Sequence, residues 1–309
     1  HDTIARVISR LKASEIEQAF QSWISSLIKK TGSDVIAIDG KTARRSFTTK
    51  GRKNALHTVS AWSCQHQLVL GQSAVDTKTN EITAIPELLS LLDIENSIIT
   101  IDAMGCQKKI AEQIIKQKAD YILALKGNHS GMQAELEAWW HKAQREGLSD
   151  KNYVEHTEID SGHGRIETRE CQQMMVDKRW LSKAYRWSDL KSIIKVNSTV
   201  HHKSTGKNTN ETRWYIASLY LNAEQSLHAV RSHWQVESMH WVLDMTFRED
   251  ESRIRKGCGA LAFNVMRKIA MGLFKQDCTK SASIAAKKKM AGLDDEYRST
   301  LLGSGIKMR

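Results

Sequence analysis

The sequence predicts an α/β fold in which a mixed sheet is flanked by helices, with a β-rich insertion before a late helix. Apolar runs of strand length alternate with helical patterns over residues 31–149. Residues 150–221 then change to β-like segments separated by polar turns, and helical periodicity returns at residue 222. With 40% hydrophobic residues, the 309-residue chain can bury one large core or a core with an inserted subdomain.

Residues 1–30 carry two amphipathic stripes that predict packing helices: Ile4, Val7, Ile8 and Leu11, then Ile16, Phe20, Trp23, Ile24 and Leu27. Ser14 and Glu17 have the spacing of a capping box for the second helix. The chain opens at His1 rather than Met, directly inside this helical pattern, so we expect that an N-terminal segment is missing. These helices could belong to a truncated DNA-binding region.

Residues 31–149 predict the first part of the core. An apolar strand ends at Asp39 and Gly40, and the runs 55–62 and 67–75 should pair antiparallel. Pro86 is expected in the first turn of a helix. Further strands are predicted up to Asp102 and over DYILALK, each followed by a helix. This succession of strands and helices is typical of a mixed sheet with helices on its faces.

The remaining chain predicts three segments. Residues 150–221 form the β-rich insertion, with SGHGR as a hairpin turn. Residues 222–277 complete the core with a long helix capped by Asn222, whose apolar positions include Trp234 and Trp241, and with a second apolar helix. Residues 278–309 form a basic tail that we expect to fray.

The positive charge is concentrated in two places. The net charge is +11, and residues 252–309 hold 13 Lys/Arg against 4 Asp/Glu. A second basic block follows Asp39: Lys41, Arg44, Arg45, Lys50, Arg52 and Lys53. Positive fields beside isolated carboxylates indicate a polyanionic substrate, although basic runs can also be plain solvated surface.

Several classes of protein are excluded by what the sequence lacks. No apolar run approaches the roughly 20 residues that cross a bilayer, and the charged start does not resemble a signal peptide, so no membrane association and a cytoplasmic location are expected. The five cysteines form no CxxC pair, which argues against a disulfide framework and a thiolate zinc site. P-loop, GxSxG and dinucleotide motifs are absent.

Three carboxylates form the candidate site. Asp39 and Asp102 each end an apolar strand, and Glu237 lies on the late helix. If they meet, they could hold the two divalent cations that phosphodiester chemistry uses, because Mg²⁺ prefers a few carboxylates with water and phosphate. Taken singly, an aspartate at a strand end is more often a turn former or a helix cap.

Other side chains leave alternatives open. His233 and His240 could join Glu237 as zinc ligands, although HxxxExxH is not the HExxH motif. The nine tryptophans could stack on bases, but Trp23, Trp140, Trp234 and Trp241 fall at apolar helical positions that favour the core. Residues 162–165 could reach a groove or a phosphate from a hairpin tip.

Five separated motifs resemble the H-repeat-associated insertion-sequence transposases, a branch of the DDE transposases: AIDGKTARRS, TIDAMGCQ, YILALKGNH, GHGRIETR and HWQVESMHWVLDMTFRED. The resemblance spans nearly the whole chain. It implies an RNase H-like core and a catalytic, metal-binding triad of Asp39, Asp102 and Glu237. It also implies Mg²⁺ as cofactor with Mn²⁺ as substitute, cleavage at transposon ends and strand transfer into target DNA. It further implies double-stranded DNA as the partner, a homodimer in the DNA complex and a nucleoid-associated location.

The resemblance also suggests residues for DNA contact: Lys41, Arg44, Arg45, Lys126, Asn128, Arg165, Arg231 and His233. Related transposases carry a Y, R, E, K signature around the glutamate, but here His233 occupies the R position and Asp244 the K position. These departures keep two other functions open. One is a catalytically impaired DNA-binding relic of a transposase, and the other is a metal-dependent phosphoesterase.

Overall fold

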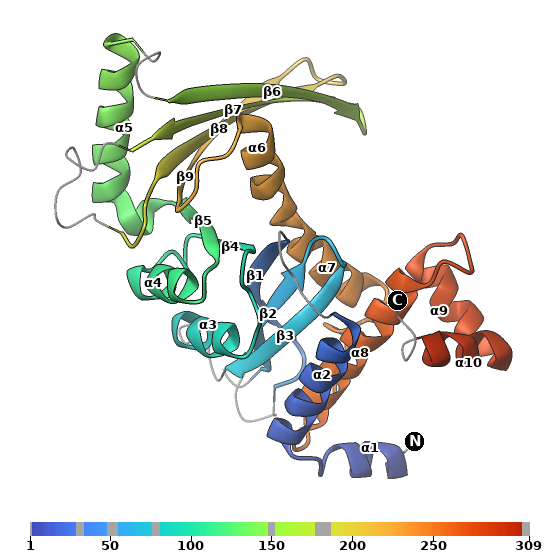
Figure 1. Cartoon of the computed structure of the whole chain (residues 1–309). Coiled ribbons are helices and arrows are strands. Elements are labelled where there is room, and N and C mark those ends of the chain that lie inside the picture. Colours follow the sequence, from blue (N-terminus) through green and yellow to red (C-terminus); the bar gives the residue numbers. More distant parts are fainter. Residues whose placement is uncertain are drawn as a thin grey trace. The chain divides into compact units, whose positions relative to one another are not determined.

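The computed structural model describes residues 2–28, 34–47, 55–75, 81–147, 152–176 and 187–304. The chain forms two compact units: His1–Asp93 with Trp234–Arg309, here called the first unit, and Ile94–His233, the second unit (Figure 1). Each contains a sheet with helices packed on it, so the expected mixed α/β class is confirmed. Among the described residues, no helix is long and apolar enough to span a membrane.

The sheet of the first unit has the order β3-β2-β1 and is antiparallel throughout. Its strands are β1 (Val35–Thr42), β2 (His57–Ser63) and β3 (Leu68–Val75), and the predicted antiparallel pairing of the second and third is confirmed. β1 runs past Asp39 instead of ending there. Successive residues therefore face opposite sides of the sheet: Gly40 one side, and Asp39 and Lys41 the other.

The Gly40 side of this sheet is covered by α3 (Glu81–Ser90). A Cβ on Gly40 would lie 2.5 Å from Glu81 Oε1, and one on Gly71 would lie 3.2 Å from Leu88. Pro86 lies inside α3 and not in its first turn, because the helix is already formed at Glu81.

The opposite side packs against α7 (Trp234–Met245) and α8 (Gly259–Gln276). The predicted long helix is divided at His233, and α6 (Ala223–Ser232) precedes the break. Asn222 caps α6 as predicted, accepting a 2.7 Å hydrogen bond from the backbone N–H of Gln225. Trp234 and Trp241 are 50% and 62% exposed, so their expected core role is wrong.

The N-terminal helices are α1 (Asp2–Ile8) and α2 (Ala13–Leu27). Phe20 and Ile24 of α2 are buried, and α2 packs on β3 and α8. The apolar stripe predicted for the first helix is mostly exposed, with Ile4 at 62% and Val7 at 56%. The predicted capping box is also wrong, because α2 begins at Ala13 after Lys12 and no side chain caps it.

The basic C-terminal tail does not fray within the described residues. It forms α9 (Ile284–Leu293) and α10 (Asp295–Ser304), which bury a cluster with the end of α8: Phe274, Ala291, Tyr297 and Leu301. Lys287 donates hydrogen bonds to the carbonyls of Phe274 and Asp277 at 3.0 and 2.6 Å. The ammonium therefore closes the C-terminal end of α8, where carbonyls have no partner in the helix.

The second unit has a mixed sheet in the order β4-β5-β9-β8-β7-β6. β4 (Ile98–Ile101) and β5 (Asp120–Leu125) are parallel and joined by α4 (Lys108–Lys116). The other strands are antiparallel: β6 (Tyr153–Gly162), β7 (Arg165–Met175), β8 (Ser192–His202) and β9 (Asn208–Ala217). The described residues between 152 and 217 supply these four antiparallel strands, and the hairpin turn predicted at SGHGR joins β6 to β7.

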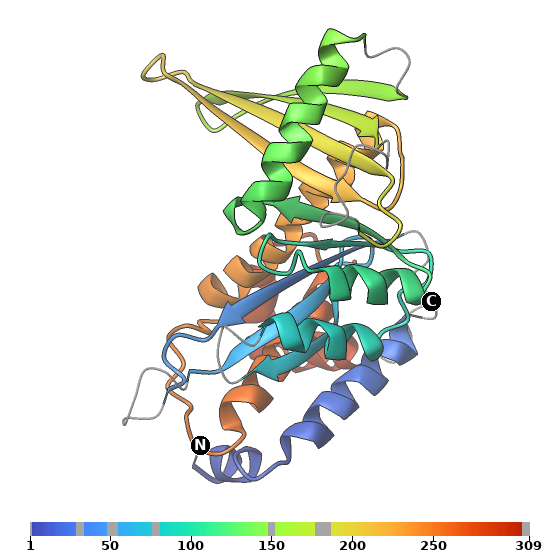
Figure 2. The same cartoon turned by 90° about the vertical axis from the view of Figure 1, so that its left-hand side faces the viewer.

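Two helices cover opposite faces of these antiparallel strands (Figure 2). From α5 (Ser130–Arg145), the fully buried Trp140 packs edge-on against Trp214 of β9, with ring centroids 5.3 Å apart. On the other face, Ser226 of α6 donates a 2.7 Å hydrogen bond to Gln173 of β7. The antiparallel strands of the second unit are therefore buried between α5 and α6.

Candidate functional site

Asp39 faces α7 from the middle of β1. Its Oδ2 lies 3.3 Å from His240 Nδ1 of α7, and the Asp39 side chain is 25% exposed. The other ring nitrogen of His240 is buried without a hydrogen-bond partner among the described residues. The Nδ1 edge of the His240 ring therefore faces the Asp39 carboxylate, and the carboxylate itself remains accessible to solvent.

Lys41, two residues further along β1, joins the strand to α7 and to the segment after it. Its Nζ lies 2.7 Å from Asp244 Oδ1 and 3.5 Å from both Glu249 Oε2 and Asp250 Oδ1. Burial alone lowers the pKa of Lys41, but the hydrogen bond with Asp244 and the nearby carboxylates raise the pKa above its ordinary value. The ammonium is therefore held charged inside the protein.

A second lysine lies behind the strand that pairs with β1. Lys268 of α8 is fully buried and donates to Ser60 Oγ at 2.8 Å and Gln72 Oε1 at 2.6 Å. Ser60 is the direct cross-strand neighbour of Asp39. Burial lowers the pKa of Lys268 to about 8. Beside Asp39, Lys268 therefore links β2 and β3 to α8 through buried hydrogen bonds.

Glu237 lies in the first turn of α7, one helical turn before His240. Its side chain is exposed and makes no hydrogen bond or ion pair with the described residues. Trp62 Nε1 donates to Gln235 at 3.4 Å, while His240 and Asp244 contact positions 39 and 41 in turn. α7 therefore runs in the same direction as β1, and Glu237 precedes the level of Asp39 by about one turn.

Asp102 belongs to the second unit and follows β4. Its Oδ1 accepts hydrogen bonds from the backbone N–H groups of Met104 and Gly105 at 3.0 and 3.2 Å. This is the turn-forming role that strand-end aspartates often have. Burial and the Asp102 charge raise the pKa of the nearby Cys106 thiol to about 12, which keeps it protonated and inert.

Neither unit taken by itself holds three His, Cys, Asp or Glu side chains placed to bind a metal ion, as far as its described residues go. His233 and His240 have separate contacts: His233 Nδ1 lies 3.1 Å from Thr100 Oγ1, and His240 faces Asp39. The histidine zinc site considered from the sequence therefore gains no support from their contacts.

The residues predicted to contact DNA are distributed over both units. Lys126 and Arg165 are exposed, the latter at the β6–β7 hairpin, while Arg231 forms an ion pair with Glu158. Arg44 pairs with Asp250 at 3.2 Å, and Arg45 is exposed. The side chain of Asn128 lies outside the described residues, as do Lys50, Arg52 and Lys53 of the basic block.

The chain is similar to known proteins of one family. The profile described as "Transposase DDE domain" matches residues 30–273. YhhI, an H repeat-associated protein of Escherichia coli K12, is 39% identical over 313 residues, covering 99% of this chain and 81% of YhhI. The chain belongs to the DDE transposases. YbfD, another H repeat-associated protein of that strain, is 46% identical over 169 residues, which cover 55% of this chain and 66% of YbfD.

The transposase also aligns with a solved structure, the piggyBac transposase synaptic complex with hairpin DNA. The alignment covers 88% of this chain and 53% of the piggyBac chain, with 10% identity and a TM-score of 0.44. A likeness of this size does not establish a common fold.

Family membership confirms the transposase function expected from the motifs over the two alternatives, the impaired relic and the phosphoesterase. DNA is the partner of a transposase, and divalent metal ions are general in the DDE family. The sequence offered no role for Phe47, Arg253 and Arg255, and it considered His240 only as a possible zinc ligand. The basic run RIRK after α7 signals the two arginines, whereas nothing in the sequence pairs His240 with Asp39.

Proposed function

We propose that the transposase cleaves DNA at the ends of its insertion sequence and joins the freed 3′ hydroxyl to target DNA, with Asp39, Asp102 and Glu237 as its metal-binding triad in an RNase H-like core. The observation that carries the proposal is the placement of α7 along β1. It presents Asp39 and the exposed Glu237 from adjacent elements of one unit. Asp102 is included in the proposed triad because of its place in the family motifs.

The donor set suits a hard divalent cation. All three side chains offer carboxylate oxygens, and Asp102 has only its Oδ1 engaged by backbone donors. Mg²⁺, with Mn²⁺ as substitute, would shield charge on the phosphoryl oxygens and lower the pKa of a bound water. The thiols of Cys64, Cys106 and Cys171 play no part, because burial raises the pKa of each to about 12.

The other residues of the chain orient the site and hold DNA. His240 limits the rotation of the Asp39 carboxylate, and Lys41 anchors the helix that carries Glu237. We assign backbone contacts to the exposed Arg45, Lys126 and Arg165, whose charges can pair with phosphate. Strand transfer joins two ends, so we expect a homodimer on DNA, in the nucleoid.

Cleavage of a plasmid that carries the chain's own gene with its flanking DNA tests the triad. Asp39→Asn, Asp102→Asn and Glu237→Gln should each lower Mg²⁺-dependent cleavage by about 100-fold or more, because even outer-shell substitutions cost about 10- to 100-fold. DNA binding should remain.

Two exposed carboxylates give matched controls, Glu296→Gln in the first unit and Asp160→Asn in the second. Both should cleave like the unaltered chain. Unchanged cleavage by any of the three triad variants would remove that residue from the site.

A further inference from the structure

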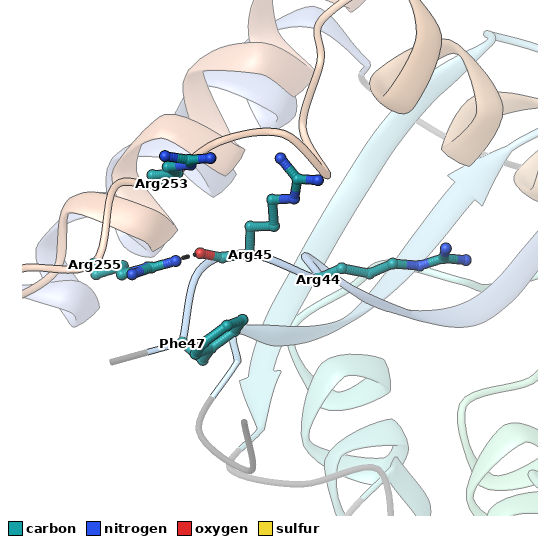
Figure 3. Close-up of a pocket in the computed structure, with 5 residues that line it drawn as sticks. All are labelled: Arg44, Arg45, Phe47, Arg253 and Arg255. Carbon is teal, nitrogen blue, oxygen red and sulfur yellow. Dashed lines mark hydrogen bonds between the residues drawn. The ribbon is translucent and has the colours of Figure 1, made fainter. Parts of the chain in front are cut away.

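Four arginines and one phenylalanine of the first unit line a cavity of about 540 Å³: Arg44, Arg45, Phe47, Arg253 and Arg255. The first three follow β1, and the last two lie in the segment between α7 and α8. Figure 3 shows Arg253 and Arg255 beside Arg45, whereas Arg44 extends away from them. Two segments more than 200 residues apart in the sequence thus place guanidinium groups around one opening.

Arg255 is held in position by its neighbours. Its Nε donates a 2.9 Å hydrogen bond to the carbonyl of Arg45, and its guanidinium lies 4.7 Å from the ring centroid of Phe47 (Figure 3). Its terminal nitrogens make no hydrogen bond to the described residues. A guanidinium fixed in this way loses little conformational entropy when it binds a ligand.

The cavity carries an excess of positive charge. Asp250 pairs with Arg44, and no other acid pairs with the lining arginines among the described residues. Arginine stays protonated at any working pH, and its planar fork matches the oxygens of a phosphate. The volume falls in the range of ligand cavities, roughly 300–1,000 Å³, and exceeds what one small ion would need.

We infer that this cavity, here called the arginine cavity, binds the sugar-phosphate backbone of the DNA strand next to the bond held at Asp39, an inference that rests on the proposed function. Arg45 follows Asp39 by six residues, so their Cα atoms are at most roughly 20 Å apart. Phosphates of one strand are spaced by about 3.4 Å along a duplex. The bound phosphates should therefore lie within about six nucleotides of the cleaved bond.

Binding to duplex DNA as a function of salt tests the arginine cavity. Arg253→Ala and Arg255→Ala should each weaken binding about tenfold at low salt, since each removes charged hydrogen bonds to phosphate. The slope of log K against log salt should fall by about 0.9 for each phosphate that the variant no longer neutralises. Lys289→Ala removes one exposed positive charge from α9 in the same unit and should change affinity less than about twofold.

Phosphate ethylation interference then locates the bound phosphates. In the unaltered chain, ethylation within about six nucleotides of the cleaved bond should block binding, and Arg253→Ala should abolish that interference. The inference would be overturned if Arg253→Ala and Lys289→Ala lost equal affinity for DNA. It would also be overturned if a variant with both Arg253→Ala and Arg255→Ala kept its full affinity. The inference would also be overturned if the arginine variants lost affinity for an acidic peptide while their affinity for DNA stayed intact. If Asp39→Asn still cleaved DNA, the proposed triad would be wrong, but the inference about the arginine cavity would stand, because affinity and ethylation interference measure binding and not cleavage.

Discussion

The ammonium of Lys41 lies 2.7 Å from Oδ1 of Asp244, which ties the strand bearing Asp39 to the helix bearing Glu237. The Y, R, E, K signature leads us to expect a lysine at the helix position that Asp244 occupies here. In this chain the helix supplies the carboxylate of the ion pair, and the strand supplies the lysine. Asp244 therefore has a partner inside the protein, and the departure from the family signature becomes a contact that fixes α7 on β1.

Removing the cation of this pair should destabilise the first unit more than removing the acid. Lys41→Met removes the ion-pair partner of Glu249, which is 1% exposed, and should lower the free energy of unfolding by about 3 kcal/mol. Asp244→Asn keeps a polar partner for Lys41 and should cost about 1 kcal/mol. Urea unfolding of both variants measures the difference.

An exposed ion pair supplies the comparison. Lys118 and Glu95 lie 3.1 Å apart with side chains 76% and 46% exposed, so Lys118→Met should change stability by less than about 0.5 kcal/mol. If Lys41→Met proved as mild as Lys118→Met, the anchoring role of Lys41 would be wrong.

Gly40, next to Asp39, should not tolerate a methyl group. An alanine Cβ would lie 2.5 Å from Glu81 Oε1, and this oxygen already makes a 2.5 Å contact with His57 Nε2. Because Glu81 and His57 are both buried, neither can move aside easily. Gly40→Ala should destabilise the chain by about 1–3 kcal/mol, measured by urea unfolding.

Gly292 in α9 offers the opposite case. No heavy atom lies within 4 Å of a Cβ built there, and alanine favours a helix over glycine by about 1 kcal/mol. Gly292→Ala should therefore be neutral or stabilising. A similar loss of stability in both alanine variants would show that the contact with Glu81 is not the cause.

Periodicity predicted the elements well where one pattern had one interpretation. The runs that became β2 and β3 alternate and pair as expected, and SGHGR forms the hairpin turn. The end of β1 was missed because DGKT contains no apolar residue to continue the strand pattern. The exposure of Trp234 and Trp241 was missed because α7 has apolar residues on more than one side. Only the set Val236, Met239 and Leu243 is buried.

The contacts around the candidate site could not be predicted from spacing. Lys41 and Asp244 are separated by 203 positions, and Lys268 and Ser60 by 208. Nothing local in the sequence distinguishes a lysine that will be buried from one that remains in solvent. Asp39, Asp102 and Glu237 were proposed from their places at two strand ends and on the late helix, together with the family motifs, and their assignment stays a prediction.

Gln173 should stabilise the second unit by holding α6 on the sheet. It is fully buried, donates to Ser192 Oγ at 2.7 Å and accepts from Ser226 Oγ at 2.7 Å. Gln173→Met leaves the buried Ser226 hydroxyl without this acceptor and should cost about 1–3 kcal/mol. Ser226→Ala removes a single hydrogen bond and should cost about 1 kcal/mol. Equal stability of Gln173→Met and the unaltered chain would exclude the anchoring role.

Lys268 should make stability rise with pH above neutrality. The pKa of this lysine is lowered by burial from 10.5 to about 8 in the folded chain. Below pH 8 both folded and unfolded states carry its proton, so the unfavourable burial of the charge is fully present. Between pH 8 and about 10.5 the folded state releases the proton while the unfolded state keeps it. The contribution of Lys268 to folding therefore improves by about 3 kcal/mol over this range.

Lys268→Met isolates that contribution, because it leaves every other titrating group in place. The free energy of unfolding of the unaltered chain, measured by urea at intervals from pH 7 to 10, should rise relative to that of Lys268→Met above pH 8. At pH 7 the two curves should run parallel, since no proton is exchanged there by Lys268. A constant difference across the whole range would mean that Lys268 keeps its ordinary pKa in the folded chain, and that the contacts with Ser60 and Gln72 compensate fully for its burial.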